Sequence, residues 1–155
     1  MGLDQYLTAK RYYSPAEWRG EETNNTFNKL IEVVNADLFV SEEIPSAEVS
    51  VKVASWRKAN AIHNWFVDNV QNGEDDCREY HVERTQLVTL RDLCKQVLDD
   101  KNSAEELLPS ISGFFFGSTE YDEWYFGDLM TTIDLLDKAL VRVPNAWDFY
   151  YQSSW

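Results

Sequence analysis

The first residues whose types and spacing could support chemistry lie in the stretch Ser55–Trp65, which reads SWRKANAIHNW. Arg57, Lys58 and Asn60 fall where a strand is predicted to end and a helix to begin. The free backbone amides of a helix's first turn favour an anion, and an arginine can stack on Trp56. The pattern therefore indicates a site for a phosphate or a carboxylate, unless the two basic side chains are only solvated.

His63 belongs to the same stretch, on the flank of the predicted helix. To act as a general acid or base it would need a partner, and the candidates are Asp76, Cys77 or a carboxylate from residues 120–122. A lone histidine in such a position is more often a structural residue. An enzyme that uses His63 is therefore the last of three hypotheses, and we assign no catalytic residue.

The cysteines offer a further possibility, because Cys77 and Cys94 supply with His63 and His81 the ligand types of a zinc site. Their spacing matches no compact zinc pattern. Two cysteines without a secretory leader are instead typical of free thiols in a reducing cytoplasm. We expect no metal and no cofactor.

A second stretch, residues 112–126, reads SGFFFGSTEYDEWYF and mixes aromatic with acidic side chains. A buried strand, a turn and a helix capped by Ser118 or Thr119 would explain most of it. This explanation does not account for Tyr121 and Trp124. Together with the neighbouring acids, they suit a contact surface for a protein or a stacked base. The residues expected to take part are Phe116, Ser118, Glu120, Tyr121, Asp122 and Trp124.

The charge balance limits the classes of partner. The chain has 27 acids against 14 bases, for a formal net charge of −13, and residues 102–137 contain no lysine or arginine. This balance argues against direct binding of a nucleic-acid backbone and against anionic membrane surfaces. No apolar run is long enough to span a membrane, and the first residues lack the apolar region of a signal peptide. We expect a cytoplasmic protein and a partner with a basic surface.

Apolar periodicity predicts the elements that must position these residues. Leu87, Leu90, Cys94 and Val97 recur at helical spacing in one predicted helix, and Leu129 belongs to the apolar stripe of the last helix. Val49, Val51 and Val53 alternate as in a strand that buries its valines, and Thr23 or Asn24 is the expected cap of the first helix. The predicted strands cover residues 6–13, 48–54, 79–83 and 147–155, with 114–116 also extended, and the predicted helices cover 24–36, 58–71, 85–99, 103–108 and 120–142. We predict an α+β fold, a single domain over residues 1–155 in which three to four helices pack on a small, mainly antiparallel sheet.

Three motifs resemble a family of small proteins from phage and prophage genomes. They are the N-terminal MGLDQYL, the central WRKANAIHNWFVDNVQNGEDDCREY, and SGFFFGSTEYDEWY. The resemblance implies a phage accessory protein that acts in the cytoplasm of a bacterial host. It implies no activity, so no residue role follows from it. Two of the motifs coincide with the two stretches described above, which favours a shared site.

Two other hypotheses rank ahead of the enzyme hypothesis. The first is a counter-defence or host-takeover protein that blocks a bacterial host protein, such as a defence component, through an acidic and aromatic surface. The second is a sponge or sensor for a small nucleotide or another anionic ligand. In the second, Trp56, Tyr121 or Trp124 would stack on a base while Arg57 and Lys58 hold its phosphate. The sequence indicates no oligomeric state.

Overall fold

The computed structural model describes residues 2–15, 20–113 and 116–155. The contacts divide the chain into two compact units. The larger unit comprises Met1–Ala9 and Lys52–Trp155, and the smaller unit comprises Lys10–Val51. The expectation of a single domain over residues 1–155 stays a prediction.

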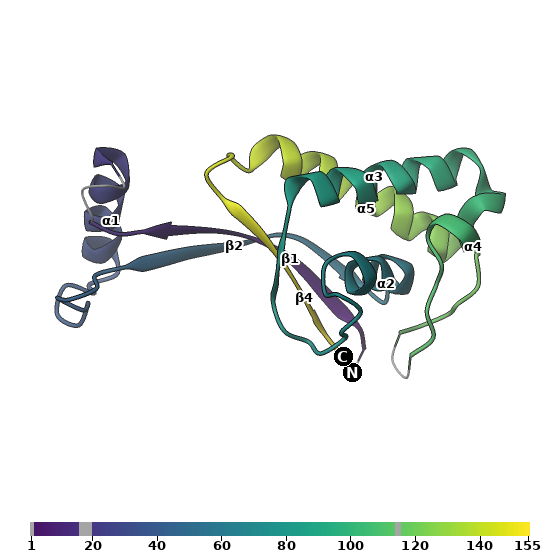
Figure 1. Cartoon of the computed structure of the whole chain (residues 1–155), viewed down its shortest axis with the longest axis horizontal. Helices are drawn as coiled ribbons and strands as arrows, with labels where there is room; N and C mark the ends of the chain where they lie inside the picture. The colour runs from purple at the N-terminus through teal and green to yellow at the C-terminus, as the bar shows by residue number, and fades with distance from the viewer. Residues whose placement is uncertain (1, 16–19, 114–115) are drawn as a thin grey trace. The chain divides into compact units, whose positions relative to one another are not determined.

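A four-stranded antiparallel sheet accompanied by five helices makes up the described fold, which confirms the predicted α+β class (Figure 1). The strands are β1 (Asp4–Tyr13), β2 (Ala47–Arg57), β3 (Tyr80–Val82) and β4 (Asp148–Ser154). Their order in the sheet is β2-β1-β4-β3. In the antiparallel β3–β4 pair, Tyr80 lies opposite Tyr151 and Val82 opposite Phe149. Each of these strands overlaps a strand that the sequence predicts.

The helices of the larger unit agree with the predicted apolar stripes. They are α2 (Asn60–Asn69), α3 (Arg84–Asp99), α4 (Ala104–Leu107) and α5 (Glu123–Arg142). Helices α3 and α5 pack along each other (Figure 1). The predicted stripe of α3 is completely buried, with no exposed fraction at Leu87, Leu90, Cys94 and Val97. Periodicity of 3.6 residues was sufficient to find this face because all four positions lie on one side of the helix.

The core of the larger unit joins α2 to the sheet through aromatic side chains. Phe66 of α2 and Tyr151 of β4 are both fully buried, and their rings stack with centroids 3.8 Å apart. Trp56 of β2 lies beside them, with its ring centroid 6.1 Å from that of Phe66. Large aromatic rings contribute much of the burial in such a core, so these contacts pack α2 against the end of β2 and against β4.

The face of β2 that is buried differs from the prediction. Val51 is 47% exposed, whereas Ala54 and Trp56 are 6% and 5% exposed. Successive residues of a strand point to opposite faces, yet Val53 also packs half-buried against the core, so both faces have contacts at this end of β2. The expectation that the valines form the buried face is therefore wrong for Val51 and holds in part for Val53.

The smaller unit contains α1 (Glu21–Val33), whose start also differs from the prediction. The helix begins after Gly20, which has a φ of 86°, and no side chain caps it. Thr23 and Asn24 therefore lie inside the helix, and the expectation that one of them is its cap is wrong. Thr23 and Phe27 are the buried residues of α1, so Thr23 takes part in the packing of this unit.

The phenylalanine run is only partly described, since Phe114 and Phe115 lie outside the described residues. Phe116 itself is not in a strand, and its N–H donates to the Gly113 carbonyl at 3.2 Å. A Cβ atom at Gly113 would lie 2.5 Å from the Phe116 ring, so only glycine fits there. Within the described ranges, no helix is both long enough and apolar enough to cross a membrane.

Candidate functional site

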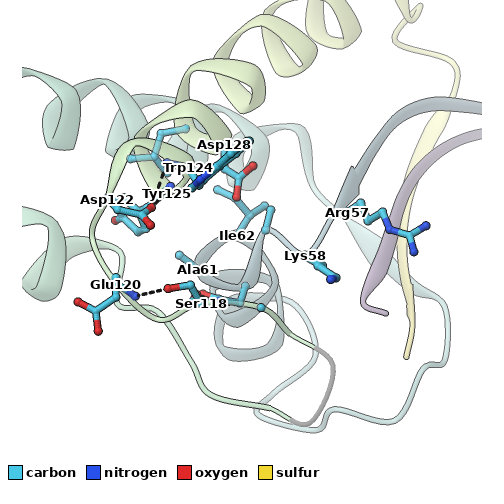
Figure 2. Close-up of a pocket in the computed structure, with 14 residues that line it drawn as sticks. Arg57, Lys58, Ala61, Ile62, Ser118, Glu120, Asp122, Trp124, Tyr125 and Asp128 are labelled. Carbon is cyan, nitrogen blue, oxygen red and sulfur yellow. Dashed lines mark hydrogen bonds between the residues drawn. The ribbon is translucent and has the colours of Figure 1, made fainter. Parts of the chain in front are cut away.

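A pocket of about 360 Å³ lies in the larger unit, between the start of α2 and the segment that leads into α5 (Figure 2). Two parts of the chain line it, residues 57–62 and residues 117–129. They overlap the two stretches that the sequence singles out, residues 55–65 and residues 112–126. Tertiary structure therefore brings the two stretches to one cavity.

The backbone between β2 and α2 presents the first wall of this pocket. Lys58 has a φ of 60°, a left-handed conformation that is uncommon for a non-glycine residue. Its N–H donates to the Leu3 carbonyl at 2.7 Å, which holds the turn. Ala59 then occupies the N-cap position of α2, and no side chain caps the helix. The uncapped first turn lines the cavity, where the helix dipole favours negative charge.

The side chain of Asn60 links the first wall to the second wall, which residues 117–129 form. This side chain is only 5% exposed, and its Nδ2 donates to the carbonyls of Ser118 at 2.6 Å and Phe116 at 3.4 Å. Gly117 lies between these carbonyls with a φ of 90°, and a Cβ there would come within 3.4 Å of the Lys58 Cβ. The close approach and the left-handed backbone both favour glycine, so the two walls meet through Asn60 and Gly117.

The helix that carries the acidic wall begins later than predicted. Asp122 is the N-cap of α5, and its Oδ1 accepts hydrogen bonds from the N–H groups of Trp124 at 3.0 Å and Tyr125 at 3.1 Å. The expectation that Ser118 or Thr119 caps this helix is wrong. Ser118 Oγ accepts instead from the Glu120 N–H at 3.1 Å, which keeps these residues in the loop that lines the pocket.

Asp128 is the most perturbed acid of the site. Burial, together with the nearby charge of Asp122, raises its pKa to about 6. With a pKa of about 6, this carboxyl group takes up a proton at a higher pH than an ordinary aspartate does. Perturbed acids of this kind are concentrated at functional sites.

Charge is divided between the two walls. Figure 2 shows Arg57 and Lys58 on the side of β2, and Glu120, Asp122 and Asp128 on the side of the segment entering α5. Arg57 forms an ion pair with Asp4, with Nη1 and Oδ1 3.5 Å apart. Lys58 forms no ion pair with any residue that the structure describes. Its ammonium group is the cation that remains available to a ligand.

Seven of the residues predicted from sequence line the pocket. They are Arg57, Lys58, Asn60, Ser118, Glu120, Asp122 and Trp124. Trp124 is 82% exposed, so its ring is accessible at the rim. Tyr121 lies next to the rim, 36% exposed, with its ring 4.9 Å from that of Tyr125 and its hydroxyl accepting from the Ser110 N–H at 3.4 Å.

Trp56 does not fill the role expected of it. Its ring is buried, and its indole N–H donates to Thr132 Oγ1 at 2.9 Å. A buried ring whose donor is satisfied cannot stack on a bound base. The strand phase of β2 decides this, because it turns Trp56 toward the core and leaves the next residue, Arg57, exposed.

His63 is also separated from the pocket. It is fully buried, and its Nδ1 lies 2.9 Å from the Tyr151 hydroxyl while its Nε2 lies 3.0 Å from Asp75 Oδ2. The carboxylate partner is thus Asp75 and none of the three candidates named from sequence. Phe116 packs its ring edge against His63 with centroids 5.0 Å apart. Both residues support the turn behind the pocket and do not line it.

Sequence reasoning missed several pocket residues. The buried side chains of Ile62 and Leu129 form apolar lining, and Asp128 supplies the perturbed acid. Helical spacing could have found Asp128, because it lies four residues after Trp124 on the same face of α5. Leu129 was expected only as a core residue, and it meets both descriptions.

The thiols lie elsewhere. Cys77 and Cys94 are free, and Cys94 is buried, which raises its pKa to about 12. Among the described residues, no three His, Cys, Asp or Glu side chains are grouped so that they could hold a metal ion.

Comparison of the chain with models of protein families, with curated proteins and with solved structures finds no match.

Proposed function

We propose that the protein is a binding protein whose pocket holds a small ligand with an anionic group at one end and N–H donors at the other. The observation that carries this proposal is the division of charge across one cavity. A cation and an uncapped helix start form one wall, and three carboxylates form the other. A volume of about 360 Å³ is within the usual size of small-ligand sites.

The anionic group would lie against Lys58 and the first turn of α2. Free amides at a helix start bind phosphate and carboxylate groups well, and the ammonium group of Lys58 adds a charge-assisted contact. Arg57 is less available because it already pairs with Asp4. A phosphate fits this wall better than a neutral group does.

The opposite end of the ligand would face Asp128 and Asp122. Carboxylates accept hydrogen bonds from amino and imino groups, which nucleobases carry on their edges. The exposed ring of Trp124 at the rim offers a surface on which a flat base can stack. A nucleotide combines these features, and the size of the cavity favours a mononucleotide over a longer chain.

The arrangement favours retention of a ligand over its conversion. His63 lies behind the pocket with both ring nitrogens engaged, so it does not reach a molecule bound there. The proposed role is therefore that of a sponge or sensor. In line with the resemblance to phage and prophage proteins, it would act in the cytoplasm of a bacterial host.

Isothermal titration calorimetry with nucleoside monophosphates, sugar phosphates and inorganic phosphate would test the proposal. Lys58→Met keeps the aliphatic stem near Gly117 and removes the charge, so it should weaken binding about tenfold or more. Lys138→Met is the matched control, because Lys138 pairs on the surface of α5 with Asp134 and does not line the pocket. Equal affinity of the Lys58→Met variant, or no binding by any phosphate compound, would contradict the proposal.

A partner protein at the acidic aromatic rim is the second candidate. The observation that favours it is the 82% exposure of Trp124 beside Glu120 and Glu123, both of which are exposed. Aromatic side chains with this exposure are enriched at protein interfaces, and the acids would attract a basic host protein such as a defence component.

This candidate predicts that Glu120→Gln with Glu123→Gln, or Trp124→Ala alone, abolishes recovery of a stoichiometric partner from bacterial lysate. Asp122 should be left intact because it caps α5. Lys58→Met should leave the interaction unchanged, which separates this candidate from the first. If all variants still recover the same partner, the acidic aromatic rim is not its binding site.

A further inference from the structure

A second surface lies wholly within the smaller unit, on residues 32–44, and is called here the 32–44 surface. Its large apolar side chains are unusually exposed: Val33 by 77%, Val34 by 61%, Leu38 by 90%, Phe39 by 78% and Ile44 by 73%. Single exposed apolar residues are ordinary on a protein surface. Five of them in one short segment mark an interaction site or a liability for aggregation.

The backbone of this segment is fixed by hydrogen bonds. After α1 ends, Asn35 adopts a left-handed φ of 53°, and the N–H groups of Asn35 and Ala36 donate back to helix carbonyls at 3.1 and 2.9 Å. The Phe39 N–H donates to the Ala36 carbonyl at 3.1 Å, and the Ile44 N–H donates to Ser41 Oγ at 3.2 Å. This is a regular helix end followed by closed turns. The apolar side chains are therefore presented by a defined backbone.

Negative charge borders these side chains. Glu32, Asp37, Glu42 and Glu43 are all exposed, and residues 30–51 contain no lysine, arginine or histidine. None of the four acids forms an ion pair with a residue in the described ranges. With respect to the described residues, their carboxylates can thus face a partner, and they fix the sign of the charge that the partner must carry.

We propose that the 32–44 surface docks a partner protein through an apolar face bordered by lysine or arginine, such as one side of a basic amphipathic helix. The exposed apolar side chains would supply the desolvated centre of the interface and the acids its charged rim. A second copy of this chain is a poor occupant, because it would bring the same four acids against one another in a molecule of net charge −13. Nucleic acids and anionic lipids carry the same sign of charge and are poor occupants for the same reason. The proposal is independent of the pocket and of any ligand there.

Fluorescence anisotropy with the full chain and labelled synthetic peptides would test this surface. The probe is a helical peptide with leucine on one face and lysine around it. Two matched peptides separate the apolar contribution from that of charge. One replaces leucine by serine, and the other replaces lysine by glutamate. The protein variants are Leu38→Ser with Phe39→Ser, and Glu42→Gln with Glu43→Gln. Val141→Ser is the control, because Val141 is 85% exposed but lies on α5.

The leucine–lysine peptide should bind the unaltered protein, and both double variants should weaken that binding about tenfold or more. Val141→Ser should bind as the unaltered protein does, and the two matched peptides should bind at least about tenfold more weakly. Circular dichroism should show that the Leu38→Ser/Phe39→Ser protein keeps its fold, since both side chains are exposed. Should it not fold, Glu42→Gln/Glu43→Gln tests the same surface.

Three results would overturn the proposal. The first is equal binding by the unaltered protein and both double variants. The second is binding of the serine–lysine peptide as tightly as the leucine–lysine peptide, which would reduce the interaction to charge alone. The third is a dimer, seen by sedimentation velocity, that Leu38→Ser/Phe39→Ser converts to a monomer, because a second copy would then be the occupant.

Discussion

Replacement of Asp128 by asparagine should stabilise the protein at neutral pH. Burial raises the pKa of this carboxyl to about 6 from an ordinary value of 3.8, so the folded protein resists its ionisation. Each pKa unit corresponds to about 1.36 kcal/mol, so full burial would cost about 3 kcal/mol. Because the side chain is partly exposed, solvent screening reduces this to about 1–2 kcal/mol. Asparagine keeps the shape of the side chain and cannot ionise, so that cost should disappear.

The sign of the effect with pH follows from proton linkage. In the unfolded chain Asp128 loses its proton near its ordinary pKa, whereas the folded protein holds the proton until about pH 6. Stability of the unaltered protein should therefore fall as the pH rises from about 4 through 6, and then remain level with respect to this group. The advantage of the Asp128→Asn variant should grow over the same interval and be absent below about pH 4.

Urea unfolding followed by circular dichroism at several pH values would measure this difference. Asp134→Asn is the matched control on the same helix, since Asp134 is exposed and pairs with Lys138. Its removal should change stability by no more than about 0.5 kcal/mol. If Asp128→Asn is neutral or destabilising at about pH 7.5, or if its effect is the same at about pH 4, the carboxyl group is not held as the structure indicates.

Three further changes test other parts of the structure. Thr132→Val removes the acceptor of the buried Trp56 indole N–H, so the free energy of unfolding should fall by about 1–3 kcal/mol, and an unchanged urea midpoint would argue against this bond. Gly117→Ala places a side chain at a φ of 90°, which should cost about 1–2 kcal/mol and lower the thermal midpoint, whereas a gain in stability would be inconsistent with that backbone. Burial raises the pKa of the Cys94 thiol to about 12, so a disulfide reagent at about pH 8 should modify only Cys77 in the folded protein and both thiols in urea. Rapid modification of both thiols without urea would show that Cys94 is accessible.

Local sequence patterns predicted the structure reliably where the apolar repeat of a single helix or strand decides which residues are buried. The stripe of α3 is completely buried as its spacing predicts, and the tail WDFYYQSSW contains β4, as expected of a last strand. Both depend on the repeat of a single element, which the sequence carries in full. The same holds for the α+β class, which follows from the order of strands and helices.

Capping and strand phase were less predictable, because each depends on competition between neighbours. Asp122 caps α5 in preference to Ser118, whose hydroxyl accepts from the Glu120 N–H in the pocket loop. In β2, Ala54 and Trp56 are buried on one face, while on the other face Val51 is exposed and Val53 packs half-buried against the core. A local pattern offers several acceptable caps or faces, and packing selects among them.

By itself the sequence determined which two stretches carry the unusual residues and what chemistry they could support. Only the tertiary structure decided that they form one pocket, because the contact that joins them runs from Asn60 to the Ser118 carbonyl across 58 positions of the chain. It also directed Trp56 and His63 into the core and brought Asp128 to the cavity. Periodicity records the neighbours of a residue along its own helix or strand. Contacts between distant segments depend on how whole faces pack, and no short stretch of sequence contains that information.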